Sequence, residues 1–95
     1  MIKREVNNLM IVVVNDESIK SLTQNVILFF KHNQILKNKM KAIIDFNQYN
    51  DSFKENIFID FFLILQEYTL ELEIVCKKNQ IEKIRNILEK TKRKK

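Results

Sequence analysis

The chain contains neither glycine nor proline in its 95 residues, and this absence limits the turns that it can form. Positive φ costs glycine nothing, and asparagine is the next most tolerant residue. Asparagine must therefore supply such turns, and several stand where turns are needed: Asn7, Asn8, Asn33, Asn38, Asn47, Asn50 and Asn79. A glycine-rich loop that cradles phosphate is also ruled out, so a nucleotide-binding or phosphotransfer centre has little support.

Four segments have the residue pattern of strands. Residues 2–14, IKREVNNLMIVVV, contain two β-prone segments around Asn7-Asn8, which predicts a hairpin. Its second arm is apolar on both faces, as a central strand would be. Residues 41–46, KAIIDF, predict a short buried strand. In residues 69–75, TLELEIV, apolar side chains alternate with glutamates, which predicts a strand with one wet face.

Two segments predict amphipathic helices that begin at polar residues. Asn15-Asp16 is the first candidate N-cap. After it, apolar residues recur at spacings of three and four over about five turns: Ile19, Leu22, Val26, Phe29 and Phe30. Near the C-terminus, Asn79 is the candidate cap of a helix with an apolar stripe: Ile81, Ile84, Ile87 and Leu88.

The segment between the last two predicted strands is ambiguous. Ser52 and Glu55 fit the capping box S/T-x-x-E, in which each side chain satisfies a free backbone N–H at the start of a helix. Residues 57–65 alternate well enough to form a strand instead, but their apolar residues also share a helical face, and we favour the helix. This segment carries more large apolar side chains than one helix face normally buries. Three aromatic residues are therefore a candidate homodimer surface, or else they belong to the core: Phe58, Phe61 and Phe62.

The predicted order of elements is β-β-α-β-α-β-α, which is an α/β fold. Strands that alternate with helices pair in parallel through right-handed crossovers, whereas the first hairpin is antiparallel. We therefore expect a four-stranded mixed sheet with helices packed on it. The expected domain covers residues 1–90, and residues 91–95, TKRKK, are a basic tail that frays.

The composition excludes several kinds of site. A single Cys76 and a single His32 give neither a disulfide nor a metal cluster, so we expect no cofactor. We expect Cys76 to pack in the fold and His32 to lie on the surface. The apolar run at residues 9–14 is too short for a signal peptide, and residues 57–65 are too short to span a bilayer. A soluble, cytoplasmic protein without enzymatic activity is expected.

Net charge is +5, and the tail supplies four of those positive charges, which leaves +1 for residues 1–90. A nucleic-acid-binding protein remains the alternative function. It would use the tail with basic residues of the last helix and the turn before it: Lys77, Lys78, Lys83, Arg85 and Lys90.

The order of elements and two short motifs resemble the STAS domain, which occurs in anti-sigma-factor antagonists and in cytoplasmic modules of some transporters. In that family the third strand ends in an Asp-Leu-Ser-type sequence, and the following loop presents Asp-Ser at the start of a long helix. Here IIDFN ends the third predicted strand, and Asp51-Ser52 looks like the second pair. The loop is about two residues shorter than in the family, and Phe53-Lys54 replaces the residue pair with glycine that follows the serine.

The resemblance implies a regulatory or adaptor module that binds a protein: an anti-sigma factor, a kinase or a transporter subunit. It implies that Ser52 is a phosphorylated switch, whereas the capping box gives Ser52 a structural role; both interpretations stay open. The expected partner-binding residues lie in the loop and the first turn of the following helix: Asn47, Asp51, Ser52, Phe53 and Glu55.

Overall fold

The structure is a computed structural model that describes residues 2–5, 8–16 and 18–92. Its strands are β1 (Ile2–Glu5), β2 (Leu9–Val13), β3 (Lys41–Asp45) and β4 (Glu71–Val75). Its helices are α1 (Ile19–His32), α2 (Glu55–Tyr68) and α3 (Ile81–Lys90), with two single 3-10 turns, η1 (Gln34–Leu36) and η2 (Lys78–Gln80). The segment that the sequence left between helix and strand is the helix α2, as we favoured.

The sheet corrects the predicted fold class. Its central part is a three-stranded, all-parallel sheet, β2-β3-β4, in which Leu9 pairs with Lys41 and Lys41 with Glu71. Together with three helices this part makes the α/β fold, in place of the four-stranded mixed sheet of STAS type that we expected. The four residues of β1 only extend the edge at β2, where they run antiparallel. A helical crossover brings successive strands in parallel, whereas β1 and β2 follow one another without a helix between them and pair antiparallel.

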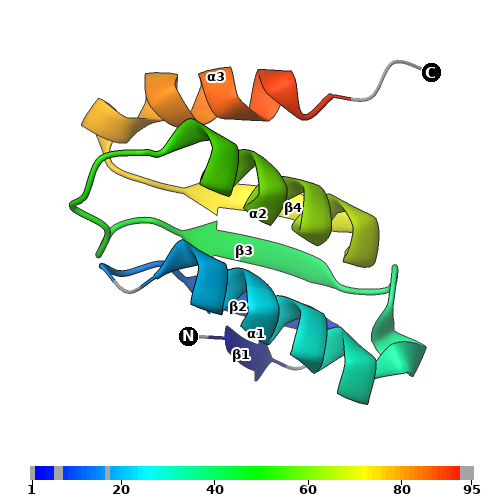
Figure 1. Cartoon of the computed structure of the whole chain (residues 1–95). Helices are drawn as coiled ribbons and strands as arrows, with labels where there is room; N and C mark the ends of the chain where they lie inside the picture. The colour runs from blue at the N-terminus through cyan, green and yellow to red at the C-terminus, as the bar shows by residue number, and fades with distance from the viewer. Residues whose placement is uncertain (1, 6–7, 17, 93–95) are drawn as a thin grey trace.

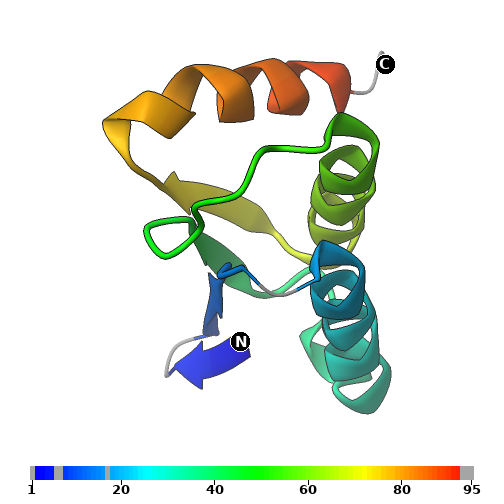
Figure 2. The ribbon, with the colours of Figure 1, turned by 60° about the vertical axis from the view of Figure 1, so that its left-hand side comes forward.

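Helices α1 and α2 cover one face of the sheet, and α3 packs beside α2 above β4 (Figures 1 and 2). The side chains that β2 and β3 point toward the helices are fully buried, among them Met10, Val12, Ala42 and Ile44. The opposite face keeps partial exposure at Ile11 and at the other outward positions of these strands. The alternation of buried and half-buried side chains therefore places the core in one layer between sheet and helices.

Phenylalanines form much of that core. Phe58, Phe61 and Phe62 are at most 1 % exposed. The rings of Phe58 and Phe62 meet Phe46, which directly follows β3, and Phe61 packs on Phe62. Burying a phenylalanine side chain stabilises a fold by roughly 1.5–3 kcal/mol. The candidate homodimer surface is therefore wrong, because α2 packs against the sheet, α1 and α3 at once and leaves none of these three rings at the surface.

Asparagine supplies the positive-φ positions, as the absence of glycine required. Asn8 and Asn38 both have φ of 61°. The predicted cap of the first helix is wrong, however. Helix α1 begins after Ser18, whose hydroxyl accepts a hydrogen bond from the Ser21 N–H at 3.4 Å. Asp16 lies outside the helix, and its carboxylate accepts a hydrogen bond from the Asn50 N–H instead.

The C-terminal end of the described chain is tied to the domain. Thr91 is 2 % exposed; its hydroxyl donates to the Leu88 carbonyl at 2.7 Å and accepts from the Gln66 side chain at 2.9 Å. Lys92 is exposed and pairs with Glu89, and the rest of the predicted tail, residues 93–95, lies outside the described residues. Across the residues that the structure places, no helix is long and apolar enough to cross a membrane.

Candidate functional site

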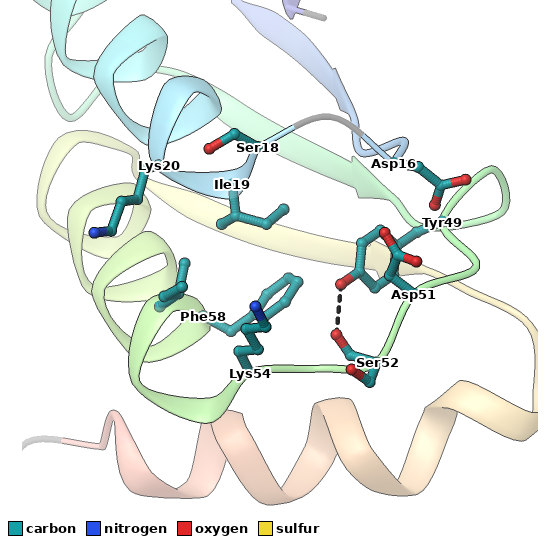
Figure 3. Close-up of a pocket in the computed structure, with 10 residues that line it drawn as sticks. Asp16, Ser18, Ile19, Lys20, Tyr49, Asp51, Ser52, Lys54 and Phe58 are labelled. Carbon is teal, nitrogen blue, oxygen red and sulfur yellow. Dashed lines mark hydrogen bonds between the residues drawn. The ribbon is translucent and has the colours of Figure 1, made fainter.

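The loop of residues 46–54 lies where the parallel strands end. It leaves the carboxyl end of β3 and enters α2, and the N-terminus of α1 lies beside it (Figure 3). Ligand sites of open parallel sheets gather at this edge. All five residues that the sequence proposed for partner binding belong to this loop or to the first turn of α2.

Three hydrogen bonds hold the loop in shape. The Asp45 carboxylate accepts from the Asn47 N–H at 2.9 Å, and the Tyr49 hydroxyl donates to the Ser52 carbonyl at 2.6 Å. Asp16, from the segment before α1, accepts from the Asn50 N–H at 2.9 Å. The carboxylate predicted to start a helix thus fixes a loop 34 residues away.

Gln80 joins the loop to the start of α3. Its side-chain amide donates to the Tyr49 carbonyl at 2.8 Å and the Phe46 carbonyl at 3.3 Å, and its oxygen accepts from the Lys77 N–H at 2.9 Å. Gln80 is 7 % exposed. Asn79 is therefore not the cap we predicted: Gln80 closes a capping box on Lys77, and α3 follows at Ile81. No sequence pattern predicts this contact, because a polar residue before a helix resembles an N-cap residue.

Ser52 does not cap a helix. Helix α2 begins at Glu55, its N-cap position is Lys54, and the Lys54 side chain makes no capping hydrogen bond. The Phe53 ring explains the shift, because it packs against Tyr49 and Phe58 with centroids 5.1 and 4.9 Å away and holds the chain extended. The predicted capping box is wrong because burial of this aromatic ring outweighs the bond of about 1 kcal/mol that a cap contributes.

The five proposed residues have different surroundings. Asn47, Asp51 and Ser52 are exposed on the loop, whereas Phe53 is half-buried in the aromatic cluster and serves as an anchor. Glu55 is exposed but forms an ion pair with Lys90 of α3. The structure therefore brings Asp51 and Ser52 together at one surface and turns Glu55 toward α3.

Two cavities flank Asp51 and Ser52. One, of about 410 Å³, opens between the starts of α1 and α2, and Lys20 and Lys54 are among its lining residues. The other, of about 380 Å³, lies toward α3 and is lined by Lys77 and Lys83. Figure 3 shows the first, with Asp16, Asp51 and Ser52 along one side. The loop thus carries an acidic tip between two sets of lysines.

Burial raises the pKa of the Tyr49 phenol above its usual value, and the carboxylates of Asp51 and Asp16 raise it further. A phenol with a raised pKa keeps its proton at neutral pH and continues to donate to the Ser52 carbonyl. Tyr49 is therefore suited to holding the loop and not to accepting a proton from a substrate.

Neither of the two residues with the most reactive side chains lies in the loop. His32 is exposed at the end of α1, and Cys76 is half-buried just after β4. Within residues 2–5, 8–16 and 18–92, no three His, Cys, Asp or Glu side chains are grouped so that they could hold a metal ion.

Comparison with known proteins finds no relative whose site could be compared with this one. No protein-family model matches the chain, and no curated protein or solved structure matches it significantly. The site must therefore be interpreted from its own geometry.

Proposed function

We propose that this chain is a non-catalytic regulatory or adaptor module that binds a protein partner through the loop of residues 47–52 and the first turn of α2. One observation carries the proposal: four side chains, from Asp16, Asp45, Tyr49 and Gln80, hold the loop in one conformation. The outer side chains of the loop stay exposed. A preformed loop binds without the entropy cost of ordering itself, which favours recognition of a partner.

The resemblance to STAS domains supports a partner of the kinds met there: an anti-sigma factor, a kinase or a transporter subunit. We propose that Asn47, Asp51 and Ser52 contact this partner, with the half-buried Phe53 as the anchor behind them. The acidic tip made by Asp51 suits a basic partner surface, because complementary charge raises the association rate and the specificity of a complex.

Ser52 is the proposed switch. Its side chain is exposed and is not used to cap α2, so a kinase would meet a hydroxyl that the described part of the fold does not need. Phosphorylation would place about two negative charges beside Asp51 and between the two lysine-lined cavities. Repulsion from Asp51 and attraction to the lysines would both change how the loop tip meets a partner.

The test is a binding measurement with the product of the neighbouring gene, wild type against Ser52→Asp and Ser52→Ala. Ser52→Asp is expected to change the dissociation constant about tenfold or more, because it adds a charge at the centre of the interface. Ser52→Ala should bind as wild type does but resist the kinase. Ser21→Asp, a charge at another exposed serine, is the matched control. Equal binding by all variants would remove the switch.

A further inference from the structure

Strand β4 is the outer strand of the parallel sheet. It pairs with β3, and among the described residues nothing pairs with its other edge. An edge strand presents a row of backbone N–H and C=O groups that can accept a further strand. Natural sheets commonly blunt such an edge with a proline or an inward charge, and Leu72, Ile74 and Cys76, the inward side chains of β4 and the residue after it, are all apolar.

The core is incomplete along this edge. The inward side chains of β2 and β3 are fully buried, whereas Leu72, Ile74 and Cys76 are only half-buried. Helix α3 stands above β4 (Figure 2) and packs beside α2, and its Ile84 and Ile87 are buried. Its Ile81 is 41 % exposed and its Leu88 is half-buried, so apolar side chains from both elements face an unfilled space.

That space is a continuous groove. A cavity of about 630 Å³ lies between β4 and α3, with Ile74, Cys76, Ile84 and Leu88 in its lining. A second cavity, of about 360 Å³, shares Ile74, Leu88 and Lys92 with the first and continues along β4 to Leu70. Leu70 is 70 % exposed, the largest exposure among the apolar residues of this edge. The groove therefore follows the whole strand.

The outward face of β4 is acidic. Glu71 and Glu73 are both exposed, and the single ammonium of Lys41 lies 3.6 and 3.5 Å from their carboxylates. One lysine on the β3 side leaves a net negative charge where the next strand would lie. Opposite charges directly across two strands are favourable and like charges are not. A segment that pairs with β4 should thus carry lysine or arginine on its outward face.

We propose that this groove binds an extended peptide segment of a partner protein, in which apolar residues alternate with lysine or arginine. The peptide main chain adds a strand to β4, its apolar side chains enter the groove under α3, and its basic side chains lie beside Glu71 and Glu73. Strand addition of this kind takes affinity from main-chain hydrogen bonds and selectivity from alternate side chains. A second copy of this chain fits less well, because antiparallel β4–β4 pairing would bring the glutamates of both copies together.

The test uses a fluorescent peptide of alternating valine and lysine, with an alternating valine and glutamate peptide beside it. The chain has a net charge of +5, so non-specific attraction would favour the acidic peptide. We expect wild type to bind the basic peptide more tightly than the acidic one. The double variant Glu71→Lys, Glu73→Lys should bind the basic peptide about tenfold more weakly than wild type does, and should prefer the acidic peptide. Glu67→Lys, at an exposed glutamate of α2, is the matched control and should bind as wild type does.

Two further peptides test the main-chain contact. One is N-methylated on every valine and the other on every lysine, so that alternate amides are blocked. Because successive amides of a strand point to opposite sides, only one set can face β4, and one methylated peptide should lose binding while the other keeps it.

Three results would overturn the proposal: no binding of the basic peptide at about 1 mM, a preference for the acidic peptide, or equal binding of both methylated forms. A dimer in solution that Glu73→Lys dissociates would also overturn it and would make a second copy the occupant. Partner binding through the loop of residues 47–52 is measured separately, so either proposal can fail alone.

Discussion

At the scale of single residues, the site depends on contacts between side chains far apart in the sequence. Gln80 satisfies two carbonyls and one N–H at once, and a buried polar group without such partners costs about 1–3 kcal/mol. Asp16 fixes Asn50 in the same way. The sequence proposed the exposed residues Asn47, Asp51 and Ser52 from their position in the loop. None of the four side chains whose hydrogen bonds hold the loop was among its partner-binding candidates: Asp16, Asp45, Tyr49 and Gln80.

Tyr49 gives a prediction for alkaline pH. Its pKa is raised in the folded state, so the folded chain holds the phenol proton more tightly than the unfolded chain does. The resulting stability is complete below about pH 10, the ordinary tyrosine pKa, and is lost as pH rises through the higher folded value. Tyr49→Phe also removes the bond to the Ser52 carbonyl, which should cost about 0.5–1.5 kcal/mol at neutral pH.

Urea unfolding of wild type and Tyr49→Phe from neutral to alkaline pH checks this. The difference in unfolding free energy between the two proteins should narrow above about pH 10, because only the wild type then loses a proton from this site. Tyr68→Phe, which removes the other phenol, is the matched control. A difference that stays constant with pH would contradict the environment described for Tyr49.

At the scale of elements, residue periodicity predicted the helices and strands well, and helix starts were predicted poorly. The N-cap of α1 is Ser18, three residues after Asn15, and the N-cap position of α2 is Lys54, two residues after Ser52. A cap contributes about 1 kcal/mol and competes with packing of neighbouring side chains. Packing of Phe53 sets the start of α2 in this way. The spacing of apolar residues within each helix is itself what packs against the core, so the helix interiors were predicted correctly.

Substitution of Ser18 and of Ser52 by alanine shows which of the two serines caps a helix. Ser18→Ala should lower the unfolding free energy by about 0.5–1 kcal/mol, because it removes the cap of α1. Ser52→Ala should leave it within about 0.5 kcal/mol, since the serine is exposed and caps nothing. Chemical denaturation measures both, with Ser21→Ala as a control on the surface of α1. An equal loss for Ser18→Ala and Ser52→Ala would restore the predicted capping box.

At the scale of the whole molecule, the distribution of basic residues weakens the nucleic-acid alternative. Two of its five proposed lysines and arginines already have partners: Lys77 donates to Asn50 and Lys90 pairs with Glu55. Lys83 and Arg85 remain exposed on α3, but Lys83 borders the cavity beside the loop and Arg85 borders the groove along β4. The positive charge is thus spread over several surfaces and does not form one stripe.

Removal of residues 93–95 tests this alternative without disturbing Thr91. The truncated chain should keep its unfolding free energy, and any affinity for a short DNA duplex should be weak and should fall steeply with salt in both forms. Fluorescence anisotropy of a labelled duplex at two ionic strengths measures the affinity and its dependence on salt. Tight binding that collapses on truncation would favour the nucleic-acid function over the adaptor.

The sequence by itself determined which segments are helices and strands, their order, and that asparagine would take the positive-φ turns, as it does at Asn8 and Asn38. These features follow from side-chain period and backbone sterics within a few residues. Only the tertiary structure decided that Gln80 and Asp16 hold the loop, that Ser52 caps nothing, and that the groove along β4 stays open. Each of these depends on which distant surfaces meet, and a local pattern carries no information about that.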